Sequence, residues 1–143
     1  PAALELAALH VAENVPAGAA APRFESVRAD AFEYARTANS EFDLAIVDPP
    51  PLARSKADLQ RASRAYKDVL IAVFRRAAPG AFVLGFSCSH QVGADLFRKI
   101  AFGAALDAGR GVRGIGQLSA PADHPVSIYH PEGEYLTGLV LET

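Results

Sequence analysis

A carboxylate and a thiol follow two short, mostly apolar runs of this sequence. Residues 42–47 lead into Asp48 and three consecutive prolines, and residues 81–86 lead into Ser87 and Cys88. Apolar runs with such sharp ends are typical of buried parallel strands. Open α/β sheets bind ligands at the carboxyl ends of their strands, so Asp48 and Cys88 are predicted to lie at one site. Asp48 could instead simply cap the turn that follows it.

Cys88 is the only cysteine of the chain, which excludes a disulfide within it and fits a reducing cytoplasm. A free cysteine is often just a small buried apolar side chain without a chemical role. As a nucleophile it would need help, because a thiol of pKa about 8.5 is only slightly ionised at neutral pH. Lys67, His90 or a bound cation could lower that pKa.

Two other patterns carry little chemistry. The histidines and the cysteine show no spacing that defines a metal site, so no metal is expected: His10, His90, His124, His130 and Cys88. Gly109, Gly111 and Gly114 spell G-x-G-x-x-G, but a dinucleotide fingerprint follows a strand and opens a helix. These glycines follow a predicted helix and open a predicted strand, so Gly109 is predicted to be a helix C-cap.

Composition favours one soluble domain. The chain has 143 residues, half of them apolar, and a formal net charge of −2. It holds no apolar stretch long enough to span a membrane and no signal-peptide pattern, so a cytoplasmic location away from membranes is expected. Nucleic-acid affinity comes from clustered Lys and Arg, so an RNA substrate would need a local basic patch or another segment.

Helical and strand patterns alternate along the chain. Helices are predicted over residues 2–14, 31–37, 59–77 and 91–108, and strands over 24–28, 42–47, 81–86, 112–118 and 136–141. Ser55 and Asp58 have the spacing of a capping box before the third helix. Asp30 follows the first predicted strand as Asp48 follows the second, although helix capping favours aspartate there equally. The alternation indicates an α/β protein with a parallel or mixed sheet and helices on both faces.

Five short motifs occur in a recognisable order: DPP at 48–50, RAYKD at 64–68, FSCSH at 86–90, ADHP at 122–125 and PEGEYLTG at 131–138. Together they resemble the catalytic half of bacterial 23S ribosomal RNA cytosine-5 methyltransferases. That family uses S-adenosylmethionine (SAM) on a class I Rossmann-like fold. The resemblance therefore implies SAM as cofactor and ribosomal RNA as substrate, and it covers residues 1–143 as one partial catalytic domain.

The resemblance also implies roles for individual residues. Asp30 would contact the adenine of SAM, with the Ala31 backbone beside it. Asp48 and Pro49 would line the cleft between cofactor and base, with Asp48 hydrogen-bonded to the pyrimidine ring. Cys88 would add to C6 of the base. Substrate contacts are assigned to four residues: Pro50, Lys67, Ser87 and His124.

Two departures from the family pattern shape the expectation for this chain. Pro51 stands where relatives often have lysine. The first two strands and the glycine-rich cofactor loop are missing, so we expect a fragment that is inactive alone. Their loss would also expose an edge of the 42–47 strand, through which homodimerisation is expected.

Three alternative functions remain open. One is an exocyclic-amine methyltransferase acting on N6 of adenine or N2 of guanine. Another is a non-catalytic interaction domain with a degenerate methyltransferase fold. The third is a cysteine hydrolase that uses Cys88, His124 and Asp123.

Overall fold

The computed structural model describes residues 2–16, 18, 20 and 23–143, which divide into two compact units, residues 1–34 and 35–143. The first unit contains α1 (Ala2–Glu13) and the beginning of α2 (Ala31–Thr37). The strand predicted over 24–28 is wrong, because that segment has no regular structure. Its large apolar side chains, Phe24 and Val27, are exposed and lie three residues apart, which is not the alternation that a half-buried strand needs.

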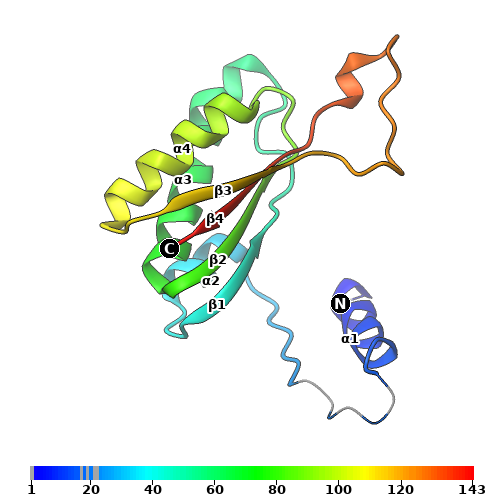
Figure 1. Ribbon diagram of the computed structural model, residues 1–143, viewed down its shortest axis with the longest axis vertical. Helices are drawn as coiled ribbons and strands as arrows, with labels where there is room; N and C mark the ends of the chain where they lie inside the picture. The colour runs from blue at the N-terminus through cyan, green and yellow to red at the C-terminus, as the bar shows by residue number, and fades with distance from the viewer. Residues whose placement is uncertain (1, 17, 19, 21–22) are drawn as a thin grey trace. The chain divides into compact units, whose positions relative to one another are not determined.

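The second unit contains a four-stranded mixed sheet. Its strands are β1 (Phe42–Val47), β2 (Ala77–Ser87), β3 (Arg113–Leu118) and β4 (Thr137–Glu142), in the order β1-β2-β4-β3 (Figure 1). β1 is parallel to β2, whereas β4 is antiparallel to both β2 and β3. The strands β1, β2 and β3 therefore end at the same edge of the sheet. This arrangement confirms the α/β class and the mixed sheet.

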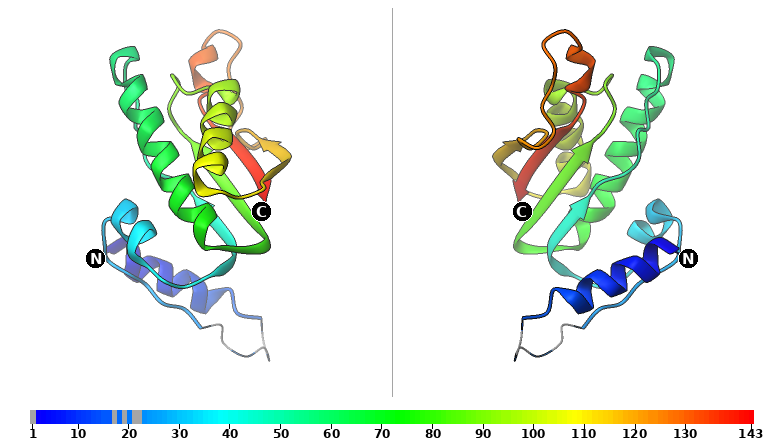
Figure 2. Two further views of the ribbon diagram at one scale, coloured as in Figure 1. Left: turned by 90° about the vertical axis from the view of Figure 1, so that its left-hand side faces the viewer. Right: turned by 90° about the vertical axis from the view of Figure 1, so that its right-hand side faces the viewer.

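Two long helices cover one face of this sheet: α3 (Leu59–Arg76) and α4 (Ala94–Ala108), green and yellow-green in Figure 2. The ring of Tyr66 on α3 meets that of Phe97 on α4 edge to face, with centroids 5.5 Å apart. Gly85 of β2 lies under both helices, since a Cβ there would be 3.6 Å from Phe97 and 3.7 Å from Leu70. The aromatic and aliphatic side chains buried between these helices and the sheet form the core.

Local signals set the ends of the helices. Asp58 accepts hydrogen bonds from the Ser55 N–H and Oγ at 3.2 and 2.8 Å, as the capping-box spacing predicts, and a 3₁₀ turn (Lys56–Asp58) leads into α3. Gly109 ends α4 in the left-handed conformation with φ of 67°, which confirms the predicted C-cap. α4 begins three residues later than predicted, because the Val92 N–H donates to the Ser89 carbonyl and residues 89–92 form a turn.

The predicted burial of β1 is wrong. β1 is the terminal strand of the described sheet, and Leu44 and Ile46 are 57% and 65% exposed. Leu44 pairs with Phe82 and Ile46 with Leu84, so these side chains share the face opposite that of the buried Val83 and the two helices.

No helix in the described ranges is both long and apolar enough to cross a bilayer.

Candidate active site

The carboxylate of Asp48 and the thiol of Cys88 meet at the carboxyl ends of β1 and β2. Val47 pairs with Gly85, so β1 gives way to Asp48 close to where β2 gives way to Cys88. Cys88 Sγ donates a hydrogen bond to Asp48 Oδ1 at 3.7 Å. The prediction that these two residues share one edge of the sheet is confirmed.

Strand alternation determines which way the thiol points. Ser87 and Ser89 are 0% and 1% exposed, whereas Cys88 between them is partly exposed. Successive side chains of a strand point to opposite faces, so the two serines turn toward the helix layer and the thiol turns away from it. Ser87 has no exposed surface in this structure, and its substrate contact stays a prediction.

The surroundings of Cys88 oppose its ionisation. Burial raises the pKa of the Cys88 thiol, and the Asp48 carboxylate raises it further through its negative charge and the hydrogen bond it accepts. The expectation that Lys67 could lower this pKa is wrong. Lys67 Nζ instead lies 2.8 Å from Asp107 Oδ2, near the C-terminal end of α4, while Cys88 precedes the N-terminal end of that helix.

The remaining predicted residues of the second unit are accessible. Pro49 is half-buried and Pro50 is exposed, so both follow Asp48 at the surface. His124 lies in the exposed connection between β3 and β4, with Nδ1 4.0 Å from the neighbouring Asp123. The acid bonded to Cys88 is Asp48 and not Asp123.

In the first unit, Asp30 caps α2. Asp30 Oδ1 accepts the Glu33 N–H at 2.9 Å, which is the capping role that the sequence left open. Ala31 is the first residue of α2 and is exposed.

The sequence did not point to a polar hollow near the start of β4. Thr137 of β4 pairs with Ser87, so the start of β4 borders the end of β2. A hollow of about 460 Å³ lies there, lined mainly by the start of α4, the end of β3 and the start of β4, with Gln117, Ser119, Glu134 and Thr137 as its polar side chains. Glu134 and Thr137 belong to the PEGEYLTG motif. Sequence patterns placed that motif in the chain but did not show that its Thr137 pairs with Ser87 at the end of β2.

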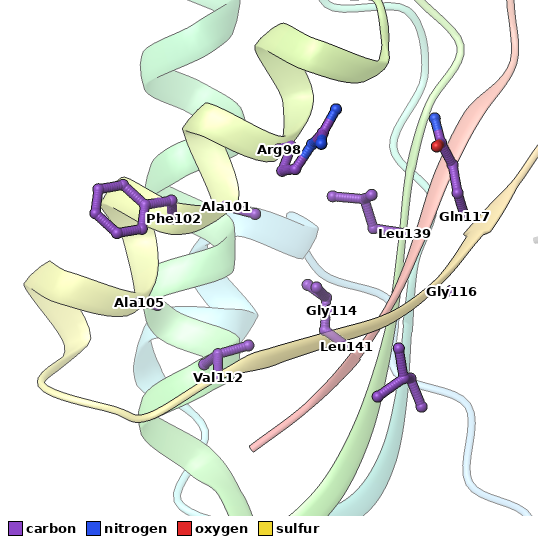
Figure 3. A pocket seen from close by; sticks show the side chains of 11 residues that line it. Arg98, Ala101, Phe102, Ala105, Val112, Gly114, Gly116, Gln117, Leu139 and Leu141 are labelled. Carbon is purple, nitrogen blue, oxygen red and sulfur yellow. The ribbon is translucent and has the colours of Figure 1, made fainter.

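A more apolar groove of about 530 Å³ lies between α4 and the β3–β4 pair (Figure 3). Phe102, Val112, Leu139 and Leu141 contribute to its walls, with Arg98 and Gln117 toward one end. Neither Asp48 nor Cys88 lines it. Among the described residues, no three His, Cys, Asp or Glu side chains gather as a metal site would require.

Comparison with known proteins supports the resemblance to ribosomal RNA methyltransferases. No protein-family model matches the chain. The large-subunit ribosomal RNA methyltransferase I of Alteromonas mediterranea is 43% identical over 143 residues, which cover 98% of this chain and 35% of that protein. The protein of the same name from Shewanella amazonensis is 46% identical over 115 residues, covering 78% of this chain and 29% of its own length. The chain thus spans about a third of the length of these relatives.

Solved structures show the same fold. A chain described as a SAM-dependent methyltransferase from Streptococcus mutans aligns with a TM-score of 0.60 at 15% identity, covering 78% of this chain and 28% of its own. A methyltransferase solved with S-adenosylhomocysteine aligns with a TM-score of 0.58 at 19% identity, covering 78% and 29%. The chain therefore has the Rossmann-like fold of the class I SAM-dependent methyltransferases. Its sequence is similar to a segment of the large-subunit ribosomal RNA methyltransferases I.

The electrostatic effect of Asp48 on Cys88 can be measured by alkylation. At pH 8 we expect iodoacetamide to modify Cys88 more slowly than a free thiol, because a raised pKa lowers the thiolate fraction. Asp48→Asn removes the negative charge and should speed the reaction several-fold. Asp43→Asn, which neutralises the exposed carboxylate near the start of the same strand, is the control. An unchanged rate in Asp48→Asn would contradict the proposed influence of its charge.

Proposed function

We propose that this chain carries the catalytic part of a SAM-dependent methyltransferase that modifies C5 of a cytosine in 23S ribosomal RNA. The observation that carries the proposal is the 3.7 Å contact between the Cys88 thiol and the Asp48 carboxylate at the carboxyl edge of the sheet. The similarity to large-subunit ribosomal RNA methyltransferases I favours the RNA substrate. Residues 1–143 would then form part of one catalytic domain.

A partly exposed thiol suits C5 chemistry because C5 of cytosine is a poor nucleophile. The thiol proton would first be lost to solvent. The Cys88 thiolate would then form the Sγ–C6 bond and move the C5–C6 π electrons to C5, which could accept the methyl group. SAM, when bound, supplies that methyl group. Loss of the C5 proton would restore the ring and break the Sγ–C6 bond. Each turnover would return Cys88 to its free form.

Asp48 would couple binding of the base to activation of the thiol. Without a base in the site, burial and then the Asp48 carboxylate raise the pKa of the Cys88 thiol. A pyrimidine amino group that donates to Asp48 would partly satisfy its charge, so the pKa of Cys88 would fall toward its ordinary value. Pro49 and Pro50 would line the cleft beside the ring, since both are at least partly exposed. In this proposal the nucleophile becomes reactive only when its target is present.

The described residues fit part of a SAM site. Asp48 and Pro49 lie at the carboxyl edge of a Rossmann-like sheet, where such folds bind ligands. In the first unit, one carboxylate oxygen of Asp30 caps α2. We propose that its other oxygen accepts a hydrogen bond from the adenine amino group, with the Ala31 backbone alongside.

The alternative functions fit the geometry less well. Exocyclic-amine methylation requires an acid and a proline shelf but no thiol, so it leaves Cys88 without a role. A cysteine hydrolase needs a histidine at the thiol, whereas the hydrogen-bond acceptor of Cys88 is Asp48. A non-catalytic interaction domain would not require the thiol and carboxylate to meet at the ligand-binding edge.

We also propose that β1 is a contact between two copies of the chain. β1 has a single ladder partner in the described sheet, and it exposes Leu44 and Ile46. An unpaired strand edge of this kind readily accepts another strand. A pair related by a twofold axis would bury these side chains symmetrically.

Covalent trapping tests the C5 chemistry. An RNA that carries 5-fluorocytidine should form a lasting adduct with Cys88 in the presence of SAM, because fluorine at C5 prevents the final proton loss. The experiment uses the longest natural polypeptide that contains this chain. Mass spectrometry of the proteolytic peptide that contains Cys88 detects the adduct. Cys88→Ser and an RNA with ordinary cytidine are the controls. Methylation of an exocyclic amine without any adduct would favour the alternative enzyme.

The proposed adenine contact is tested by calorimetric titration with SAM. Asp30→Asn preserves helix capping, since asparagine caps as well as aspartate, but it removes the carboxylate charge. We expect SAM to bind about tenfold more weakly, as is typical when a charge-assisted hydrogen bond is lost. Asp43→Asn in the same polypeptide should bind normally. Equal affinities in the two variants would rule out the Asp30 contact.

The proposed self-association is tested by light scattering after size-exclusion chromatography. Ile46→Lys should shift the 143-residue chain toward the monomer, because a lysine on an edge strand opposes strand addition. Ile115→Lys places the same charge on the exposed β3 at the other end of the sheet and should leave the dimer intact. A monomeric wild-type chain at micromolar concentration would refute the proposed contact.

A further inference from the structure

Three hydroxyl groups lie buried beneath the Asp48–Cys88 pair. Tyr66 of α3, Ser87 and Ser89 are each no more than 1% exposed. Burying a hydroxyl is unfavourable unless it is hydrogen-bonded. Within the described residues, no buried side-chain nitrogen or oxygen lacks a hydrogen-bond partner, and these three hydroxyls bond to one another and to the backbone. They form a connected group directly behind the thiol.

Ser89 joins the end of β2 to the loop that follows Asp48. Its Oγ accepts the backbone N–H groups of Leu52 and Ala53 at 3.0 and 3.1 Å. The prolines at 49–51 have no N–H, so these are the first backbone donors after Asp48. A single oxygen thus binds both donors at the end of the proline run.

Tyr66 holds Ser89 from the helix layer. The two hydroxyl oxygens are 3.2 Å apart, Ser87 Oγ donates to Tyr66 Oη at 3.2 Å, and the Ser89 N–H donates to Ser87 Oγ at 3.3 Å. A hydroxyl has two acceptor sites, and Leu52 and Ala53 occupy those of Ser89. The contact with the Tyr66 hydroxyl is the third hydrogen bond of the Ser89 oxygen. Because Tyr66 also packs against Phe97, the group is fixed to both α3 and α4.

We propose that Ser89, held by Tyr66, is a positioning residue that sets the separation of Asp48 from Cys88. Ser89 directly follows Cys88 in the chain. Its hydroxyl also binds the far end of the loop that starts at Asp48. Ser89 is therefore connected to the thiol through one peptide bond and to the carboxylate through a short loop. Only the effect of Ser89 on the reaction with RNA rests on the proposed function. The geometric part stands on the hydrogen bonds alone.

Removal of the Ser89 hydroxyl should have two opposite effects. Leu52 and Ala53 would lose their shared acceptor, so the loop would move and Asp48 would leave the thiol. Without the adjacent carboxylate, Cys88 would ionise more readily and react faster with a small alkylating agent. Reaction with RNA would become slower, because the carboxylate would no longer be aligned with the base. A general loosening of the fold would also expose the thiol, so the comparison is made only between variants that remain folded.

The experiment compares three variants of the longest natural polypeptide that contains this chain. Iodoacetamide modification of the Cys88 peptide at pH 8 should be several-fold faster in Ser89→Ala than in the wild type. Tyr66→Phe should give a smaller increase, because the bonds from Leu52 and Ala53 remain. Ser63→Ala is the matched control, since its Oγ also lies on α3 but donates to the Leu59 carbonyl at 2.7 Å. Its rate should equal that of the wild type.

An unchanged alkylation rate in folded Ser89→Ala overturns the proposal. If that variant does not fold, as judged by circular dichroism, Tyr66→Phe decides, and an unchanged rate there overturns the proposal equally. The 5-fluorocytidine adduct is then measured in the same proteins. Absence of an adduct in the wild type, together with faster alkylation in Ser89→Ala, would refute the cytosine-5 function while supporting the positioning role.

Discussion

Three consecutive prolines make the loop after β1 depend on one oxygen atom. Residues 49–51 stiffen the chain but donate no backbone hydrogen bond. The next two N–H groups, those of Leu52 and Ala53, both donate to Ser89 Oγ. One end of the loop is therefore set by the ladder of β1 and the other by a side chain at the end of β2. Asp48 lies between these two anchors, directly after β1 and four residues before Leu52.

The position of Asp48 meets one requirement of a nucleophilic site and works against another. A carboxylate 3.7 Å from a thiol is well placed for a ligand that contacts both, but it raises the pKa of the thiol. The folded chain therefore disfavours the thiolate that covalent chemistry needs. The proposed function resolves the conflict if the base supplies hydrogen-bond donors to Asp48. An isolated thiol of raised pKa is also protected from oxidation and alkylation, because the thiolate is the reactive form.

The sequence predicted the elements better than the contacts. The helices and most strands follow from local apolar periods, and Gly109 follows from its position after a helix. Asp48 and Cys88 could be paired because strand ends in a parallel arrangement share an edge. Lys67 was misplaced because residues on one helix turn can face different neighbours, and its partner Asp107 lies 40 positions away. The exposure of β1 depends on strand order, which local periods do not contain.

The buried hydroxyl group shows what kind of signal was overlooked. Tyr66 belongs to the apolar stripe of α3, where its ring fits the pattern but its hydroxyl does not. A phenol buried in a core needs a polar partner. The short polar side chains that flank Cys88 in the sequence are two serines, and alternation turns both toward the helices. The pattern S-C-S at a strand end, opposite a tyrosine on a covering helix, is therefore better interpreted as two anchored serines that orient one thiol.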